Sequence, residues 1–451
     1  MSRVRDLIAF AVGKALVLTA KVMRRDGHHI PGRQAYQVSH GVMDFIAKPK
    51  DIIFVTGTNG KSTTTALVSH LLTVAGKKVA HNTESNTQPG ITTALLKNVS
   101  WLNRPQADVL VLEVGEEALP KVMKVIKPTY LLTTNVQKDT FQVNCSPNYI
   151  WDIISSVITD DMTLFVNNDD PGVLALAAGH PAAITYGVER NAYSAEPPHG
   201  EFDIAGHCPI CHAPLVFDYY NIPTIGRFHC TACDFASREK VDFAATGFDL
   251  TAETVTIGDV TLPMHYTAAH FVYDYLLAYA FARRYGIGDD VIKQAFDTFV
   301  NIGGRLETQE YHGMQLSYSR FKQETPDTVQ SAIDFICLDK QPKTVVVCLQ
   351  VVDNEPWGPR FTETFYSYDC SFEKLADANV TQFICCGEYV AHDTANRLLY
   401  AGVARDKILI VDSDEPEDFL AILRQNAPQQ VYIMTWLHTY KEIKKALGAR
   451  P

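Results

Sequence analysis

One short segment constrains this chain more than any other, the run Thr56-Gly57-Thr58-Asn59-Gly60-Lys61-Ser62-Thr63. It follows a β-rich apolar run at residues 51–56 and precedes a helical pattern at residues 63–75. Two glycines let backbone N–H groups turn toward phosphate oxygens, Lys61 can reach the β- and γ-phosphates, and Ser62 can ligate Mg²⁺. The spacing is shorter than in the general phosphate loop, but the strand and helix context is the expected one. The segment therefore predicts binding of ATP and Mg²⁺.

Further apolar runs separated by helical stretches predict an α/β fold with parallel strands and ligands at the strand ends. In the first part of the chain they lie at residues 109–114, 130–134 and 163–166. After Gly303-Gly304 the alternation begins again, at residues 344–352, 380–386, 408–411 and 431–435. We expect an N-terminal helical segment at 1–45, a central ATP-binding domain at 46–302 and a smaller Rossmann-like domain at 303–451.

The net charge bears on whether the chain binds nucleic acid, and the cysteine content bears on the cellular compartment. Forty basic and fifty-one acidic residues give a net charge of −11, which repels a nucleic-acid backbone. Ten cysteines in 451 residues are too few for a disulfide scaffold. We therefore expect a cytoplasmic protein that does not bind nucleic acid.

Four cysteines form two C-x-x-C pairs: Cys208, Cys211, Cys230 and Cys233. Such pairs can surround one Zn²⁺ tetrahedrally, and four protein ligands leave no open position for water. The pattern predicts a structural zinc ribbon, inserted in the central domain at residues 205–236. His212 and His229 adjoin the pairs and are the alternative ligands.

The N-terminal segment is the part of the sequence that is apolar enough to suggest contact with a membrane. Residues 7–22 are apolar apart from Lys14, Thr19 and Lys21, and arginines flank them at positions 3, 5, 24 and 25. The stretch is too short and too interrupted for a membrane span. Two alternatives remain: a helix packed on the body of the protein, or an interfacial helix in peripheral contact with the inner face of an anionic membrane.

The run TGTNGKST resembles the phosphate loop of Mur-type amide ligases, which activate a carboxylate as an acyl phosphate that an amine then displaces. Other stretches agree with this resemblance, at residues 82–93, 134–135, 167–171 and 304–307. By this resemblance Glu113, at a strand end, binds Mg²⁺ together with Ser62. It also implies that Asn135, Asp169 and Arg305 contact the nucleotide.

A four-cysteine insert followed by a small α/β domain resembles one branch of that class, the MurT-type ligase subunit of lipid II isoglutaminyl synthase. The resemblance implies that the chain phosphorylates the α-carboxylate of D-glutamate in the stem peptide of lipid II. It also implies a GatD-type glutaminase as partner in a heterodimer, which supplies ammonia for amidation to D-isoglutamine.

The family's C-terminal domain lends its glutaminase a carboxylate that orients a catalytic His. In this sequence the corresponding loop is about three residues longer, so its alignment is not unique. An anchor on Tyr368-Asp369 makes Glu363 the lent carboxylate, and Asp353 is the second choice. A Glu orients a His as an Asp does.

Departures from the family pattern leave two other functions open. The stretch His270 to Asp274 replaces the family's Asn-containing approach to the adenine. Such changes are consistent with a divergent ligase that acts on another carboxylate or adds an amino acid. They are also consistent with a nucleotide-binding scaffold that docks a glutaminase without catalysing ligation.

Overall fold

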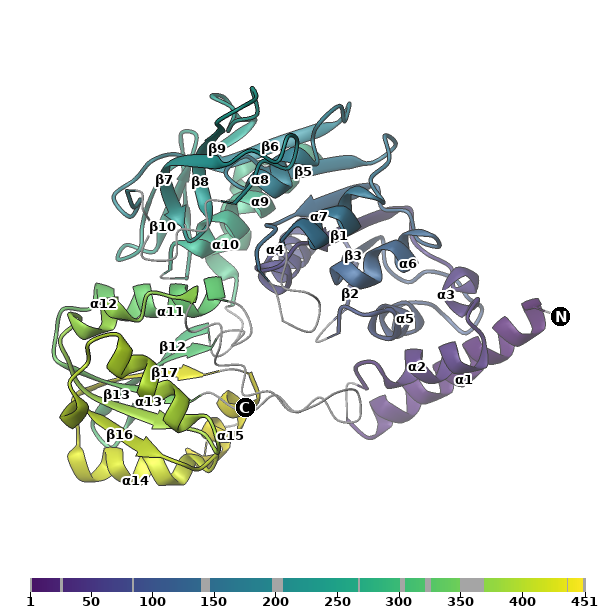
Figure 1. The fold of residues 1–451 in the computed structure, drawn as a ribbon. Coiled ribbons are helices and arrows are strands. Elements are labelled where there is room, and N and C mark those ends of the chain that lie inside the picture. Colours follow the sequence, from purple (N-terminus) through teal and green to yellow (C-terminus); the bar gives the residue numbers. More distant parts are fainter. Residues whose placement is uncertain are drawn as a thin grey trace.

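The computed structural model describes residues 2–24, 27–82, 85–138, 147–196, 206–266, 268–300, 305–320, 326–348, 369–435 and 437–448. They form two α/β bodies, each built on its own sheet, and a small two-stranded sheet beside them (Figure 1). We call these the first body, the second body and the ribbon hairpin.

The first body contains a nine-stranded sheet of order β11-β10-β9-β6-β5-β4-β1-β3-β2. Its strands are β1 (Asp51–Thr56), β2 (Val79–His81), β3 (Val109–Glu113), β4 (Tyr130–Thr133), β5 (Thr163–Asn167), β6 (Ala183–Val188), β9 (Phe243–Asp249), β10 (Thr254–Ile257) and β11 (Val260–Pro263). In this order the neighbours from β9 through β6, β5, β4, β1 and β3 to β2 pair in parallel. The strands β9, β10 and β11 form an antiparallel edge. The parallel pairing brings the carboxyl ends of β1, β3 and β4 to one edge of the sheet.

Helices cover both faces of this sheet, which explains why β1 is an almost continuous apolar run. Successive side chains of a strand point to opposite faces. Ile53 and Val55 pack into one core with α4, α9 and α10, and Ile52 and Phe54 pack into the other with the remaining helices. The helices of the first body are α1 (Ser2–Val22), α2 (Ile30–Val38), α3 (Val42–Phe45), α4 (Lys61–Val74), α5 (Gln88–Lys97), α6 (Leu119–Met123), α7 (Pro147–Ser155), α8 (Pro171–Ala175), α9 (His270–Tyr285) and α10 (Asp289–Thr298).

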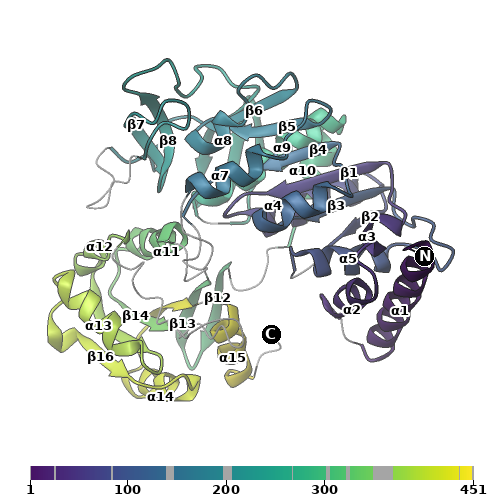
Figure 2. The same cartoon turned by 45° about the vertical axis from the view of Figure 1, so that its right-hand side comes forward.

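The N-terminal helices form an outer layer of the first body. α1 packs against α2, α3 and α5 and lies at the rim of the molecule in both ribbon views (Figures 1 and 2). Ala9 and Phe10 of α1 are buried in the core that these helices share. Among the described residues, no helix combines the length and the apolar character that crossing a bilayer requires.

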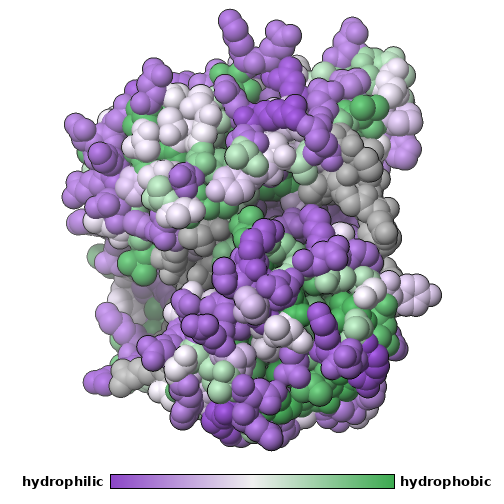
Figure 3. Space-filling model, turned by 90° about the vertical axis from the view of Figure 1, so that its left-hand side faces the viewer, coloured by the Kyte–Doolittle hydropathy of each residue, from purple (hydrophilic) through white to green (hydrophobic). Residues whose placement is uncertain are grey.

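The ribbon hairpin consists of β7 (Leu215–Ile222) and β8 (Ile225–Cys230) with the cysteine-containing turns on either side. Its aromatic core, with Phe217 and Phe228, packs against Leu174 of α8. Figure 3 views the molecule from the side of the ribbon hairpin and the second body, and hydrophilic residues cover most of this face.

The second body contains a six-stranded sheet of order β12-β13-β17-β14-β15-β16, parallel except for the β12-β13 hairpin. Its strands are β12 (Arg305–Tyr311), β13 (Met314–Arg320), β14 (Lys343–Cys348), β15 (Val380–Cys386), β16 (Ile408–Val411) and β17 (Gln430–Thr435). Its helices are α11 (Pro326–Leu338), α12 (Glu373–Ala376), α13 (Ala391–Tyr400), α14 (Pro416–Asn426) and α15 (Leu437–Ala446). Separate cores fill the two faces, one under α11 to α13 and the other under α14 and α15.

The helix α2 approaches α5 so closely that a side chain at Gly32 has no space. The Gly32 N–H donates a hydrogen bond to Thr93 Oγ1 at 2.9 Å. A Cβ at this position would lie well under 3.0 Å from the backbone oxygen of Pro89. We therefore expect Gly32→Ala to force the two helices apart and to lower the free energy of unfolding by about 1–3 kcal/mol.

Chemical denaturation followed by circular dichroism measures this loss. Gly247→Ala is the matched control, because nothing lies within 4 Å of a Cβ built there. Equal stabilities of the two variants would contradict the close packing of α2 on α5.

Candidate active site

The phosphate loop connects the end of β1 to the first residue of α4, and both of its glycines have left-handed backbones. Gly57 has φ +117° and Gly60, which caps α4, has φ +83°. Neither site has space for a side chain, because a Cβ at Gly57 would meet Thr134 Oγ1 and one at Gly60 would meet Asp274 Oδ1. The turn thus leaves the N–H groups at the start of α4 available to an anion.

Asn135 holds this loop from the end of β4. Its Oδ1 accepts the Asn59 N–H at 2.8 Å, and its Nδ2 donates to the Asn59 carbonyl at 3.1 Å. The Asn135 carbonyl also accepts the Thr58 N–H at 2.8 Å. The predicted site residue Asn135 therefore lies at the phosphate loop and fixes its shape, while its contact with a nucleotide stays a prediction.

Lys61, at the first position of α4, is buried and forms an ion pair that the sequence did not reveal. Its ammonium lies 3.0 Å from Glu116 Oε1 and also donates to the carbonyls of Gly57 and Thr58. Both members of the pair are only 6% exposed. Glu116 follows β3 in a Glu-Glu pair, and only its burial distinguishes it from the exposed Glu117.

Glu113 ends β3 beside the phosphate loop, because it pairs in register with Val55 of β1. Asn86 Nδ2 donates to the Glu113 carboxylate at 3.2 Å. The Asn82 side chain accepts the Glu113 N–H at 2.8 Å and donates to the Glu113 carbonyl at 2.7 Å. Ser62 lies one residue into α4 and is half-buried. The fold thus brings the ends of β1 and β3 to the same edge of the sheet, where a Mg²⁺ bound by Ser62 and Glu113 would adjoin the phosphates.

Asp169 and Asp170 follow β5 and are buried among protein donors. Asp169 accepts the Val188 N–H and the Tyr273 hydroxyl, both at 2.7 Å, and burial raises the pKa of its carboxyl to about 6. Asp170 caps α8, and burial raises its pKa to about 7. These hydrogen bonds join β6 and α9 to the end of β5 through Asp169, and the contact of Asp169 with a nucleotide stays a prediction.

A chain of hydrogen bonds runs from the phosphate loop to the second body. Asn59 Nδ2 donates to Gln137 Oε1 at 2.9 Å, and Gln137 Nε2 donates to Thr224 Oγ1 at 2.9 Å. The Thr224 hydroxyl donates to Asp327 Oδ1 at 3.1 Å, at the start of α11. Thr224 has φ +62° at the tip of the ribbon hairpin, which is a strained conformation for a β-branched residue. The ribbon hairpin therefore bridges the nucleotide loop and the second body.

A cavity of about 230 Å³ lies beside this bridge, between the two bodies and the ribbon hairpin. Its wall combines apolar side chains such as Trp151 and Phe217 with Lys138 and Asp327. Lys138 pairs with Asp369 of the second body at 3.0 Å. Burial raises the pKa of the Asp327 carboxyl to about 7, and the nearby Asp170 raises it further. The cavity thus offers both apolar surface and polar groups of either charge.

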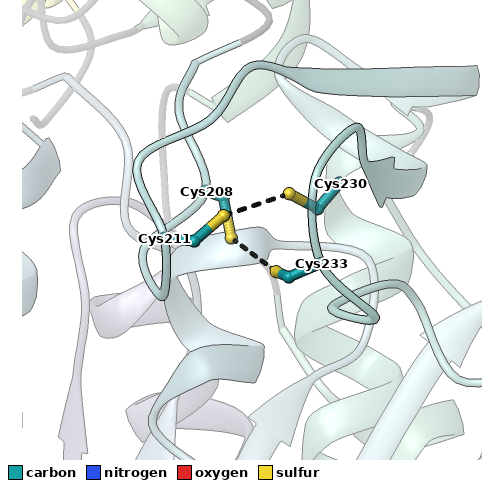
Figure 4. Close-up of side chains that lie close together, drawn as sticks. All are labelled: Cys208, Cys211, Cys230 and Cys233. Carbon is teal, nitrogen blue, oxygen red and sulfur yellow. Dashed lines mark hydrogen bonds between the residues drawn. The ribbon is translucent and has the colours of Figure 1, made fainter.

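The four predicted zinc ligands meet at one point, although they come from two separate turns (Figure 4). Their sulfur atoms all lie within 4.8 Å of one another, with Cys208 to Cys233 at 3.7 Å and Cys211 to Cys230 at 3.4 Å. A tetrahedron with Zn–S bonds of about 2.3 Å has edges of about 3.8 Å, so the sulfurs fit a zinc ion. Backbone N–H groups of Ile210 and Ala232 donate to Cys208 and Cys230. His229 instead lies 3.4 Å from Asp218.

The side chains of three further predicted site residues lie outside the described part of the chain. Glu363 and Asp353 lie outside the described residues. Arg305 opens β12, where its backbone pairs with Ser319, but its side chain is also outside the described part.

Known families match both bodies of this chain. Residues 55–229 match the Mur ligase middle domain, and residues 323–442 match the MurT ligase C-terminal domain. The MurT subunit of lipid II isoglutaminyl synthase (glutamine-hydrolyzing) from Staphylococcus aureus strain N315 is 27% identical over 390 residues, 85% of each chain. The same subunit from Streptococcus pneumoniae is 28% identical over 435 residues, 94% of this chain and 93% of that one.

Solved structures agree on the fold. A pseudomurein peptide ligase type C from Methanothermus fervidus superposes with a TM-score of 0.67 at 18% identity, covering 90% of this chain and 80% of that one. The MurF ligase from Thermotoga maritima in complex with ADP gives a TM-score of 0.61 at 14% identity, covering 92% and 84%.

The phosphate loop, the sheet that carries it and these matches define the class: the chain is a ligase with the Mur ligase fold. Within that class it is similar to MurT subunits along nearly the whole chain, which supports a divergent MurT. The predicted resemblance is thereby confirmed.

The ion pair of Lys61 and Glu116 leads to a prediction about nucleotide affinity. A phosphate oxygen that takes the Lys61 ammonium must compete with the Glu116 carboxylate, which also repels phosphate. We expect Glu116→Gln to tighten binding of a non-hydrolysable ATP analogue by about three- to tenfold, or about 1 kcal/mol. Isothermal titration calorimetry in magnesium buffer measures the change.

Glu117→Gln is the control. Glu117 is the next residue and is exposed, so this change removes the same charge without touching the buried ion pair. If Glu116→Gln weakened binding, Glu116 would be a residue that positions Lys61 for the phosphate rather than a competitor of it.

Proposed function

We propose that this chain is the ATP-dependent ligase subunit that amidates the α-carboxylate of D-glutamate in the stem peptide of lipid II. The observation that supports this most is the similarity to MurT subunits along nearly the whole chain, in a fold that presents Lys61 at the helix end of a phosphate loop. The relatives are named as subunits of lipid II isoglutaminyl synthase, which supports the substrate, and the phosphate loop supports the use of ATP.

In the proposed reaction the acceptor carboxylate attacks the γ-phosphorus of ATP, so that ADP leaves and an acyl phosphate forms. Ammonia then attacks the acyl carbon, and inorganic phosphate leaves as the amide forms. The transfer brings anions together and needs cations at both ends. Lys61 and the α4 N-terminus supply positive charge, Ser62 and Glu113 are the proposed Mg²⁺ ligands, and Arg305 is a proposed nucleotide contact.

The ammonia donor in this proposal is a GatD-type glutaminase in a heterodimer with the chain. The relatives are named as subunits of a glutamine-hydrolysing enzyme, which supports a partner that hydrolyses glutamine. We propose that the region after β14 lends this partner a carboxylate, with Glu363 as the first candidate and Asp353 as the second.

Replacement of Lys61 tests the ligase. We expect the chain to amidate lipid II with ATP, Mg²⁺ and ammonium, and Lys61→Ala to reduce turnover at least a hundredfold, because the transferred phosphoryl group loses its buried cation. Mass spectrometry of the product measures the amide. Lys77→Ala, at an exposed lysine after α4, is the control. Full turnover by Lys61→Ala would exclude the phosphate loop from the mechanism.

The cysteine cluster carries a second part of the proposal, a structural zinc ion. We expect about one zinc per chain, since four thiolates in this geometry form a closed tetrahedral site. Cys211→Ser should lose the metal and lower the melting temperature of the chain, as measured by elemental analysis and calorimetry. Cys337→Ser is the control, because Cys337 lies in α11, away from the cluster. A chain purified without zinc, with unchanged stability in chelator, would refute the site.

A further inference from the structure

The first helix has apolar residues on two opposite faces. One face, with Ala9, Phe10 and Gly13, packs on the first body. The other follows the helical spacing of three and four residues and faces solvent; we call it the outer stripe, and its members are Val4, Leu7, Ile8, Ala11, Ala15, Leu18 and Val22. The five large members are between 50% and 76% exposed. A contiguous stripe of this kind marks an interaction surface rather than ordinary exposed residues.

Basic side chains border the outer stripe. Arg3, Arg5, Lys21 and Arg24 are all exposed, at the two ends of the helix. The one acidic residue of α1, Asp6, accepts a hydrogen bond from the Ser39 hydroxyl. This local excess of positive charge occurs on a chain whose net charge is −11. The partner that complements the stripe must therefore be apolar and bordered by negative charge.

An exposed tryptophan lies next to the helix. The Trp101 ring lies 5.8 Å from the Lys14 ammonium of α1 and is 56% exposed. The adjacent Leu102 is 76% exposed. Tryptophan side chains are typical of surfaces that are apolar at one end and wet at the other.

A second copy of the chain fits this surface poorly. If two outer stripes met in an antiparallel pair, Arg3 and Arg5 of one copy would face Lys21 and Arg24 of the other. In a parallel pair the arginines would face their own counterparts. Like charges at an interface oppose association, so self-association leaves the basic border without a partner of opposite sign.

We propose that the outer stripe is a membrane-docking surface, which lies in the headgroup layer of a bilayer rich in anionic phospholipid. The helix of 21 residues would lie in the plane of the membrane, with its apolar residues between the acyl chains and its arginines and lysine at the phosphates. Both ribbon views place α1 at the rim of the first body, with no element of the second body beside it. The large residues of the outer stripe are exposed in the structure that contains both bodies.

Vesicle co-sedimentation of the full chain tests this surface without any ligation substrate, so its outcome is independent of the proposed function. We expect binding to vesicles of equal parts phosphatidylglycerol and phosphatidylcholine, weak binding to phosphatidylcholine alone, and weaker binding at high salt. The double variant Leu7→Gln/Leu18→Gln should lower the partition coefficient at least about tenfold, because two large apolar side chains leave the membrane. The tryptophan fluorescence of the chain should shift to the blue on binding, and Trp101→Phe should abolish this shift.

Tyr400→Gln is the matched control, since Tyr400 is 83% exposed at the end of α13 in the second body. The melting temperatures of all variants should agree, because both leucines are exposed. Absence of binding, or equal binding to both vesicle types, would overturn the proposal. A dimer in analytical ultracentrifugation that the double variant dissociates would instead assign the outer stripe to a second copy.

Discussion

The close packing of the phosphate loop against the ends of β4 and α9 is the constraint on which the rest of the site depends. Gly57 and Gly60 adopt left-handed backbones against Thr134 and Asp274, where a Cβ would collide. Asn135 then fixes the backbone of Asn59 from both sides. With the loop held in this way, Lys61 donates to the carbonyls of Gly57 and Thr58 and pairs with Glu116. The first N–H groups of α4 stay available to an anion at the helix N-terminus.

The same loop is connected to parts of the chain that are remote in sequence. Gln137, Thr224 and Asp327 continue its hydrogen bonds through the ribbon hairpin to the second body. The four cysteines sit at the opposite end of the hairpin from Thr224, where a metal would hold the two turns together. A short insert can therefore hold a defined position between two larger bodies, even though its own apolar core is small.

Buried ionisable groups lie at the site, whereas the basic groups at the two ends of α1 are exposed. Buried carboxyl groups lie behind the strand ends, where burial raises the pKa of Asp169 to about 6 and of Asp170 to about 7. Buried Lys61 is paired with Glu116 and faces the loop. Four exposed basic residues lie at the two ends of α1, which is far from the phosphate loop in the ribbon views. The proposed recognition of phosphate and the proposed contact with an anionic surface thus fall on separate elements.

The sequence alone determined the local features whose chemistry depends on near neighbours. The phosphate loop, the flanking strand and helix, and the cysteine spacing follow from residue types at fixed short separations, and the structure has β1, α4 and the cysteine cluster at those positions. The parallel strands β3, β4, β5, β14, β15, β16 and β17 were also predicted, because strands buried on both faces are continuous apolar runs.

Only the tertiary structure decided which residues from distant parts of the sequence contact the phosphate loop. The strands β9 to β13 were not predicted, since they mix polar with apolar residues and do not form continuous apolar runs. Glu116, Asp274 and Gln137 became site residues through contacts across many residues of sequence, which no local pattern records. The apolar outer face of α1 required the same knowledge, because a sequence shows which residues are apolar but not which of them the fold covers.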